Sequence, residues 1–544
     1  MERLSTLKRF NQVSTLLTTL IVQPIVRAVK GYASFILNLQ VQAGLKVDFT
    51  RNPLTYVMLR TLAYPLATYL ITYVLLHSVR IETMSSLSRL AGAIPYNYLP
   101  VIASILAIPA YPLLTYLKAV ERGRKVESEL KYFIICESIV AAGDPDLVED
   151  LSTINEDIFP TLSRESAIFR RLRKLMTVPN VVSTYCRWIR SRFASMLLKD
   201  YVFAASLGIK RTWLREKGNE VLEDLRVSSL NAVKARTLVS ILLAVVLGYV
   251  PPIVVTMATL LGQSIIGRVL ALTLAAFPVF FIVTPKPPTH FRMFLDKGLL
   301  PLRVALLSAC VLAFLAPVAL EYHPCIPYQV RGLLQVLWKL RTLLCVGLLA
   351  ISLKQVRELM LGLKEAVGLS NALLSLASAP LGMTNALSLV KEVFSRAGSP
   401  SLKELSKDVG LGGRSLGRAV GKAKLWLTKY VIFAITRILR YGVFNRESIM
   451  KLRELATEMM RQFRTAAVSN LAIVALCVGL PYILTYACSF SPHLLNSGVA
   501  SMYAVLSTLL YSTYVSYVVF DDPLNTLLPA VAMLELSLIG GASV

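Results

Sequence analysis

Residues 118–146 read KAVERGRKVESELKYFIICESIVAAGDPD, and they open a polar segment that extends to Arg236. Charged residues recur throughout this segment, and no apolar run within it reaches the roughly 20 residues that a membrane helix needs. The sequence on either side is apolar. A second polar segment, residues 354–464, repeats the arrangement later in the chain. The sequence therefore predicts two water-exposed domains that are separated and flanked by membrane helices.

The composition indicates a membrane protein. Of the 544 residues, 55% are hydrophobic and 17% are charged, and the mean hydropathy is +0.60. Lys and Arg number 58 against 32 acidic residues. Such an excess in a soluble protein would suggest nucleic-acid binding, but no basic stripe with interleaved aromatic residues is present. In a membrane protein the excess is typical of cytoplasmic loops, so we expect no nucleic acid as a partner.

About nine apolar runs have the length of membrane helices. They lie at approximately residues 54–77, 98–117, 237–260, 265–284, 299–320, 333–353, 467–489, 499–520 and 524–544. Because Lys and Arg favour the cytoplasmic side, both polar segments are predicted to be cytoplasmic. The chain is then a multi-pass protein of the cell (cytoplasmic) membrane, with a cytoplasmic N-terminus and, since the number of spans is odd, an external C-terminus.

The predicted fold class is an all-α integral membrane protein with two cytoplasmic helical-bundle domains. Its parts are an N-terminal cytoplasmic segment 1–53, membrane helices in 54–117, a first domain 118–236, membrane helices in 237–353, a second domain 354–466, and membrane helices in 467–544. Apolar residues within both domains recur at three- and four-residue steps, which is the helical period. The predicted helices are 163–176, 181–199, 221–234, 354–377, 384–395, 425–439 and 446–463.

Gly143 is predicted to end the first long helix of the first domain. The residues that follow are Asp144, as the cap of a new helix, and Pro145, at its first helical position. Each domain begins with a long helix that leaves the membrane, continues through a glycine-bearing turn, and ends with a charged helix that returns to it. This layout predicts two copies of one structural unit.

Three local patterns resemble those of a known family. Ala43-Gly44-Leu45 precedes the first apolar run, and Glu129-Leu130-Lys131-Tyr132-Phe133 is followed by Ala141-Ala142-Gly143. Residues 197–222 contain Gly208 and read as a second helical pair. With the layout of the whole chain, these patterns resemble the type II secretion F-domain family, in particular the archaeal platform proteins of archaella, archaeal type IV pili and tight-adherence pili.

The resemblance implies a role without catalysis. Such platforms contact a hexameric secretion ATPase from the cytoplasm and pilin or archaellin subunits in the membrane, and they are expected to pass ATP-driven motion to the subunits. We expect no enzyme activity and no cofactor, with membrane lipids and a second copy, in a homodimer, as further partners. The F-domain turns are assigned to Gly143, Gly208 and, in the second domain, Gly382. A polytopic transporter with paired repeats is the alternative.

Basic residues of both domains are the predicted ATPase contacts. These candidates are Arg187, Arg190, Arg192, Arg414, Arg418, Lys422 and Lys424. The last four belong to a glycine-rich stretch, residues 410–424. This stretch fails the phosphate-loop pattern, because Leu416 replaces the first glycine and Ala423 follows the lysine. It is interpreted as a basic connector that contacts an acidic partner or anionic lipid, or is simply solvated.

Charges and cysteines in the membrane give two further predictions. Glu535 is predicted to pair with Lys339 or Arg341 across helices, the alternative being that the two cations extend to the membrane surface. Cys325 and Cys488 are both predicted outside, where a disulfide would persist; two free thiols are the alternative. The cysteines and histidines show no metal-binding spacing, so neither a metal site nor a catalytic group is expected.

Overall fold

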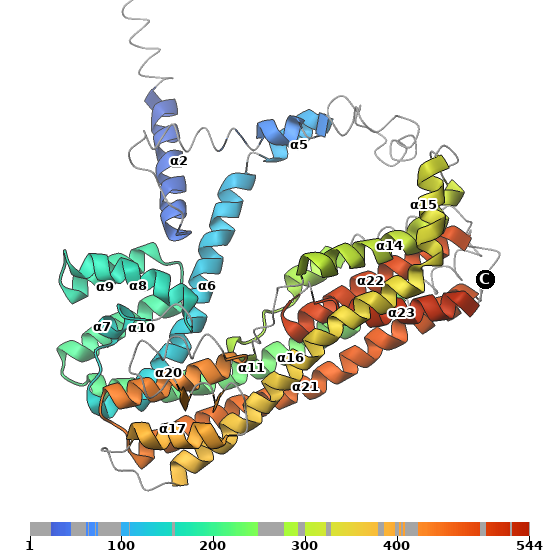
Figure 1. The fold of residues 1–544 in the computed structure, drawn as a ribbon. Helices are drawn as coiled ribbons and strands as arrows, with labels where there is room; N and C mark the ends of the chain where they lie inside the picture. The colour runs from blue at the N-terminus through green and yellow to red at the C-terminus, as the bar shows by residue number, and fades with distance from the viewer. Residues whose placement is uncertain are drawn as a thin grey trace, which may run out of the picture. The chain divides into compact units, whose positions relative to one another are not determined.

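A computed structural model defines the fold of the chain. It describes residues 23–44, 99–107, 109–154, 158–248, 277–291, 300–322, 328–378, 386–397, 423–489, 497–522 and 525–542, with scattered residues within 61–73 and 402–407. Within these residues every regular element is a helix (Figure 1). The predicted all-α class is therefore confirmed.

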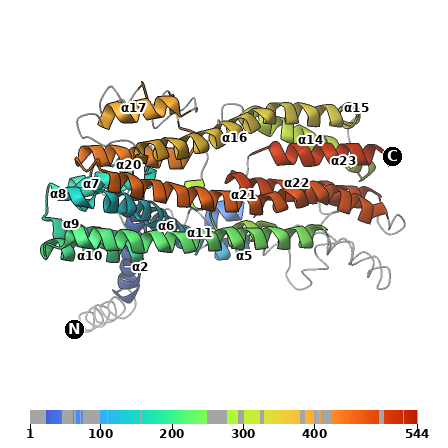
Figure 2. The same ribbon diagram turned by 90° about the horizontal axis from the view of Figure 1, so that it is seen from below.

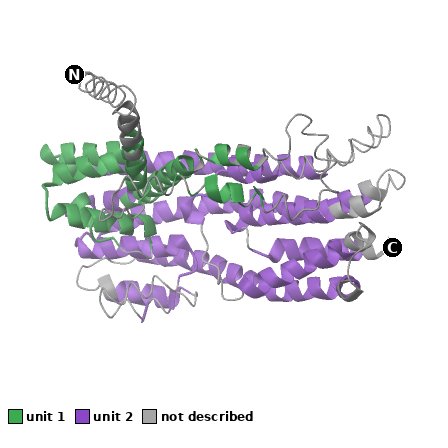
Figure 3. Cartoon of the chain, turned by 90° about the horizontal axis from the view of Figure 1, so that it is seen from above, with its two compact units in different colours: residues 1–133, 146–213 green, residues 134–145, 214–544 purple. Residues whose placement is uncertain are grey.

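The chain divides into two compact units, coloured separately in Figure 3. The first unit comprises residues 1–133 and 146–213, and the second comprises residues 134–145 and 214–544. The first unit thus holds most of the predicted first domain. The second unit holds the predicted second domain, the apolar helices of the C-terminal half and a short piece of the first domain around Gly143.

The helices of the first unit are short, apart from the first long helix of the predicted domain. They are α2 (Gln23–Gln42), α5 (Leu99–Ala107), the first part of α6 (Ala110–Ile139), α7 (Leu147–Leu151), α8 (Pro160–Arg173), α9 (Val178–Trp188) and α10 (Arg192–Ser206). Aromatic pairs build the core. The ring centroids of Phe133 and Phe159 lie 6.2 Å apart at right angles, and those of Phe169 and Tyr185 lie 4.3 Å apart. All four side chains are buried.

The turn after α6 differs in detail from the prediction. Asp144 does not cap the start of the next helix: it has φ +58° and is the C-terminal cap of the short 3₁₀ helix η4 (Ala141–Gly143). Asp146 caps α7 instead, because its carboxylate accepts hydrogen bonds from the backbone N–H groups of Val148 at 3.0 Å and Glu149 at 3.3 Å. Pro145 therefore lies before the cap and not at the first helical position, and that prediction was wrong.

The predicted helix 181–199 is two helices. α9 ends at Trp188, and Ile189 and Ser191 adopt extended backbone conformations. The Ser191 hydroxyl accepts a hydrogen bond from Ala194 N at 3.2 Å and so starts α10. Serine in this position stabilises a helix start, and this local bond competes with continuation of α9.

The second unit contains the long helices. They are α11 (Lys210–Gly248), α14 (Leu300–Tyr322), α15 (Tyr328–Lys339), α16 (Arg341–Ser378), α17 (Ala386–Arg396), α20 (Trp426–Arg440), α21 (Arg446–Ser489), α22 (Ser497–Phe520) and α23 (Leu527–Ala542), with the 3₁₀ helix η6 (Thr289–Phe291). α16, α21 and α23 pack against one another, and α22 packs against α21 and α23. α11, α16 and α21 follow the length of the unit (Figure 2).

At two predicted junctions between domain and membrane the helix is continuous. The predicted helix 221–234 and the run that starts at residue 237 form one helix, α11, of 39 residues. Likewise, the predicted helix 446–463 and the run 467–489 form α21, of 44 residues. Neither junction contains a proline or glycine, so nothing in the local sequence interrupts the helical backbone.

Among the described residues, three helices are long and apolar enough to cross a membrane: α11, α21 and the part of α22 from Tyr503 to Phe520. α15 and α16 satisfy the same test together, but they are bent by 61° at their junction, so the predicted run 333–353 is not one straight helix. Residues 300–316 and 527–539 form shorter apolar helices. The count of nine spans stays a prediction.

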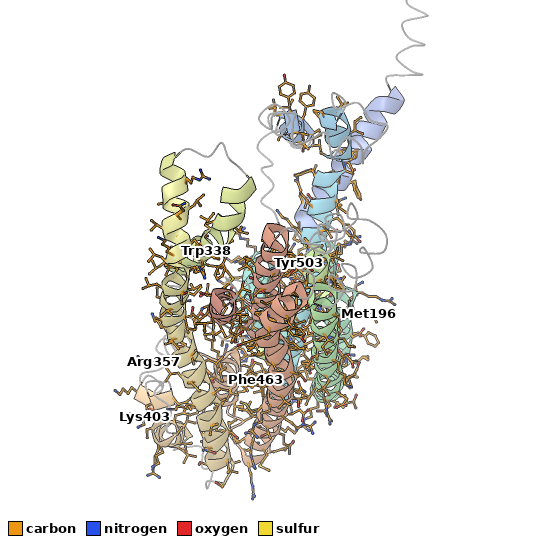
Figure 4. The ribbon with its side chains drawn as sticks, turned by 90° about the vertical axis from the view of Figure 1, so that its right-hand side faces the viewer. Met196, Trp338, Arg357, Lys403, Phe463 and Tyr503 are labelled. Atoms are coloured by element: carbon orange, nitrogen blue, oxygen red, sulfur yellow. The ribbon has the colours of Figure 1, made fainter. Side chains whose placement is uncertain are left out.

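Aromatic and small side chains pack the apolar end of the second unit. One buried cluster joins Leu243 and Leu247 of α11 to Tyr511, Tyr514 and other residues of α22. The Tyr503 hydroxyl donates to Leu247 O at 3.0 Å. A second cluster includes Cys310, Phe314 and Met533. Figure 4 labels three aromatic residues of this unit, Trp338, Phe463 and Tyr503.

One turn has the same geometry in both units. α10 ends at Gly208, which has φ +75°, and Ile209 N donates to Ala204 O at 3.0 Å. α20 ends at Gly442, which has φ +65°, and Val443 N donates to Ile438 O at 3.1 Å. This is the helix stop in which glycine supplies the left-handed residue.

Candidate functional site

Arg122 of α6 joins three segments of the first unit. Its guanidinium forms two parallel hydrogen bonds with Glu165 of α8, from Nε to Oε1 at 2.8 Å and from Nη2 to Oε2 at 2.7 Å. Nη1 donates to the carbonyl oxygens of Val41 at 2.8 Å and Gln42 at 3.0 Å, at the end of α2. The forked geometry of arginine allows all four bonds at once. Arg122 therefore ties α2 to the helical domain.

The glycine of the Ala43-Gly44-Leu45 pattern lies against this arginine. Gly44 has φ +68°, and a Cβ atom built on it would lie 3.3 Å from Cδ and Nε of Arg122. Both facts favour glycine at this position. The conformation turns the chain out of α2 beside the carbonyl groups that Arg122 binds.

Acidic residues of α6 hold the starts of α8 and α10. The Glu129 carboxylate accepts hydrogen bonds from Thr161 N at 2.9 Å and Leu162 N at 2.7 Å, in the first turn of α8. Glu127 accepts from the hydroxyl of Ser191, the cap of α10, at 3.0 Å. Negative charge at a helix N-terminus is stabilising, because the first N–H groups there have no partner within the helix.

The second unit uses the same device. Glu365 of α16 is fully buried, and its carboxylate accepts from Lys424 N at 3.1 Å and Leu425 N at 3.2 Å, immediately before α20. In each predicted domain, then, a glutamate on the opening helix, α6 or α16, binds the start of a later helix. This is a second feature that the two predicted repeats share.

The end of α6 is bound to α20 within the second unit. Arg437 Nη2 donates to Glu137 Oε1 at 2.6 Å, and the two side chains are 6% and 0% exposed. Nearby, a Cβ atom built on Gly143 would lie 2.7 Å from Cβ of Tyr441 and 3.1 Å from its carbonyl oxygen. The predicted turn glycine Gly143 is therefore required for a close approach to the end of α20.

The predicted ATPase contacts fall into two groups. Arg187, Arg190 and Arg192 lie exposed around the link between α9 and α10, and the Arg190 guanidinium stacks over the ring of Tyr116 at 4.1 Å. Lys424 is partly buried beside Glu365. Arg414, Arg418 and Lys422 lie outside the described residues, as does Gly382.

The predicted pairing of Glu535 with Lys339 or Arg341 is not formed in the described part of the chain. The Arg341 guanidinium lies 3.7 Å from the ring centroid of Trp338 and donates to the Trp338 carbonyl oxygen at 3.3 Å. Lys339 is exposed. Glu535 Oε2 is buried without a hydrogen-bond partner. The bend between α15 and α16 places both cations at the junction, where the arginine packs on its neighbouring tryptophan.

A buried arginine, Arg236, lies where the apolar part of α11 begins, and it was not predicted. Arg236 is 4% exposed, and its Nη2 donates to the carbonyl oxygens of Tyr517, at 3.0 Å, and Val518 at the end of α22. Cations at a helix C-terminus are stabilising. In the sequence Arg236 is simply the last residue of the predicted first domain. Gly442 was also missed, although comparison of residues 204–209 with 438–443 would have indicated it.

The described cysteines do not form a site. Cys136, Cys186, Cys310, Cys345 and Cys477 are free thiols, and burial raises the pKa of the Cys186 thiol. The placement of Cys325 and of the Cys488 side chain lies outside the described part of the structure. Within the described part, no group of three or more His, Cys, Asp or Glu residues is arranged to hold a metal ion.

Comparisons of the chain with protein-family models, with curated proteins and with solved structures found no match. The resemblance to the F-domain family therefore stays a prediction.

Proposed function

We propose that this chain is the polytopic membrane platform of an archaeal type IV pilus-like filament machine. In this proposal a cytoplasmic secretion ATPase binds the helical domains, and its motion is passed to pilin or archaellin subunits in the membrane. The chain itself carries no catalytic activity. The observation that carries the proposal is the continuity of α11 and α21 from charged domain to apolar span.

Both helices are much longer than a bilayer requires. With 39 and 44 residues, α11 and α21 extend about 58 and 66 Å at 1.5 Å per residue. A span uses roughly 20 residues of each, so a similar length of each helix projects beyond the membrane. A continuous helix resists bending more than a loop does, so a displacement of the charged part reaches the apolar part.

Polar contacts join these two helices in their charged halves. The Ser229 hydroxyl of α11 donates to Gln462 Oε1 of α21 at 2.7 Å, and Arg226 Nε lies 3.3 Å from Glu458 Oε1. Arg236 then binds the end of α22. α11, α21 and α22 are thereby linked at the level where charged sequence gives way to apolar sequence. Such links favour movement of the three helices together.

The test is reconstitution. The full chain in lipid nanodiscs is mixed with its cognate secretion ATPase, and both binding and the rate of ATP hydrolysis are measured. The proposal predicts saturable binding, and no hydrolysis by the chain alone. Absence of binding by the ATPase to well-folded chain, or nucleotide turnover by the chain alone, would contradict it.

A transporter remains the alternative, and one observation favours it. The hydroxyl groups of Ser507, Thr508 and Ser516 on α22 are buried without hydrogen-bond partners among the described residues, as is Glu535 Oε2 on α23. Unpaired polar groups in a membrane bundle are costly and are typical of solute or ion paths. Solute or proton flux into proteoliposomes, lost in Glu535→Gln, would support the transporter and count against the platform.

A further inference from the structure

α10 carries two apolar faces, and only one of them is used within the first unit. Its inner face consists of the buried residues Ala194, Leu197, Leu198, Tyr201 and Ala204. On its outer face, Met196, Phe203 and Leu207 are 52%, 67% and 57% exposed. An amphipathic helix on the surface of a domain normally has one apolar face and one polar face. Phe203 and Leu207, the most exposed of these residues, therefore indicate a surface that another molecule covers.

The outer residues gather at one end of the α9–α10 hairpin. Cys186 and Ser195 lie opposite each other in this hairpin, since the Ser195 hydroxyl donates to Cys186 O at 3.5 Å. The two helices of the hairpin run in opposite directions. The start of α9, which Leu175 and Met176 precede, therefore lies at the same end as the last turn of α10, about ten residues from this contact on each side. Leu175 and Met176 are 79% and 42% exposed, and Ile209 is 52% exposed. We call Leu175, Met176, Phe203, Leu207 and Ile209 the distal patch.

Contacts with α6 show which end of the hairpin this is. From Arg190 to Phe193 the chain contacts successively later positions of α6. The Arg190 guanidinium lies over the ring of Tyr116. The Ser191 hydroxyl donates to Glu127, and the Lys131 ammonium lies over the ring of Phe193. α10 therefore runs in the same direction as α6, away from the apolar start of α6. The distal patch lies about 20 Å beyond Phe193, and roughly 40 Å beyond Leu117 along these helices.

This position excludes the bilayer as a simple occupant. Exposed apolar residues of α6 end at Leu117, and charged residues begin at Lys118. A membrane surrounding the apolar start of α6 ends there, well short of the distal patch. The patch is therefore suited to a macromolecule that approaches from the side opposite to the membrane.

The charges around the patch define the chemistry of the partner. The basic residues at this end of the hairpin are Arg170, Arg171, Arg173, Lys174, Lys199, Lys210 and Arg211, and the nearby acids are Glu149 and Asp200. Arg173 already lies 3.5 Å from Glu149. The excess of cations favours an acidic surface. A second copy would bring the same cations together, which is unfavourable.

We propose that the distal patch is the docking surface for an acidic protein partner whose contact face has an apolar centre. This inference rests on the proposed function, in which the partner is the secretion ATPase. It moves the principal contact from the predicted cluster of Arg187, Arg190 and Arg192, at the membrane-facing end of the hairpin, to the opposite end. Phe203 and Leu175 supply buried apolar contact area, and the surrounding cations supply orientation and speed of association.

The experiment measures binding of purified cognate secretion ATPase to the full chain in nanodiscs by biolayer interferometry. The double variant Phe203→Gln/Leu207→Gln removes the apolar centre, and Arg171→Glu/Lys174→Glu reverses charge at its edge. Each is expected to weaken binding at least tenfold, and the weakening by charge reversal should shrink at high salt. Met196→Gln is the matched control, because Met196 is an exposed apolar residue of α10 outside the patch (Figure 4). Its affinity should equal that of the original chain.

Each other outcome contradicts the proposal in a recognisable way. If the ATPase binds the original chain and both double variants equally, the patch is not the docking surface and the proposed function stands. If the ATPase does not bind the original chain, both fail. Loss of binding to vesicles of anionic phospholipid, with ATPase binding intact, would assign the patch to lipid. A change only in oligomeric state would assign it to a second copy. Circular dichroism of every variant confirms that the helical fold is retained.

Discussion

Arg437 on α20 and Glu137 on α6 are 300 residues apart in sequence and form a buried ion pair at 2.6 Å. The pair joins the helix that opens the first predicted domain to a helix of the second. Such a pair is weak support for stability when compared with apolar residues of the same size, but removing one partner leaves a buried charge without compensation. This asymmetry makes the pair a sensitive test of the fold.

Glu137→Gln should destabilise the second unit by about 3–5 kcal/mol. The expected readout is a lower midpoint of thermal unfolding in detergent, followed by intrinsic fluorescence. Glu447→Gln is the control, because its 2.7 Å pair with Lys451 is exposed and should contribute little. Replacing both members of the buried pair, as Glu137→Leu/Arg437→Met, should recover part of the loss. Equal midpoints for Glu137→Gln and Glu447→Gln would contradict this account.

Arg122→Lys should release α2 while keeping the positive charge. Lysine cannot make the two parallel bonds to Glu165 and still reach the carbonyl oxygens of Val41 and Gln42. We expect faster trypsin cleavage after Arg27 and Lys30, measured by mass spectrometry of timed digests. Arg124→Lys, at an exposed position on the same helix, is the control. Unchanged cleavage in Arg122→Lys would show that α2 is held by other contacts.

Gly218→Ala should destabilise the packing of α11 on α6, because the added Cβ atom would lie 2.2 Å from Cβ of Ser138. Overpacking of this kind costs about 1–3 kcal/mol. Ser138→Gly should rescue Gly218→Ala, since it removes the atom that the new methyl group meets. Gly347→Ala has open space around the added carbon and serves as the control. Thermal unfolding of the four variants tests the prediction, and the absence of rescue would contradict the stated close approach.

Buried His290 should make stability depend on pH on the acidic side. It is 4% exposed, and burial lowers its pKa to about 3 from an ordinary value of 6.5. Between these values the unfolded chain binds a proton that the folded chain does not. The contribution of His290 to stability is thus complete above pH 6.5. It falls by at most about 1.4 kcal/mol per pH unit as the pH decreases toward 3.

Chemical denaturation of the original chain and of His290→Asn measures this dependence. The pH values should run from about 4 to about 7, because the ordinary pKa of histidine is about 6.5. Asparagine keeps a hydrogen-bonding side chain but does not titrate. The stability difference between the two proteins should shift in favour of the variant as the pH falls. A difference that stays constant over the range would show that His290 does not titrate as stated.

Much of the helical content could be predicted from apolar periodicity, but helix ends could not. Ile189 continues the apolar pattern of α9, so the break before α10 depends on the hydrogen bond that Ser191 makes to Ala194 N. The bend between α15 and α16 also lies within an apolar run that has the length of one span. At these places local geometry overrides the pattern.

The contacts that organise the candidate site could not be read from the sequence, because they join distant residues. Arg122 binds carbonyl groups about 80 residues away and Arg236 binds carbonyl groups more than 280 residues away, and no periodicity marks either arginine. The turn at Gly208 was predicted, whereas the turn of the same geometry at Gly442 was not. The predicted turn at Gly382 lies outside the described residues.

The central claim is that both charged helical domains face the cell interior, where an ATPase can act on them. The direct measurement uses a cysteine-free version of the chain with one cysteine returned at exposed Lys199 in the first domain or exposed Glu454 in the second. Intact cells and opened cells are treated with a membrane-impermeant maleimide. The account predicts labelling of both positions only after the cells are opened. Labelling of either position in intact cells would contradict it.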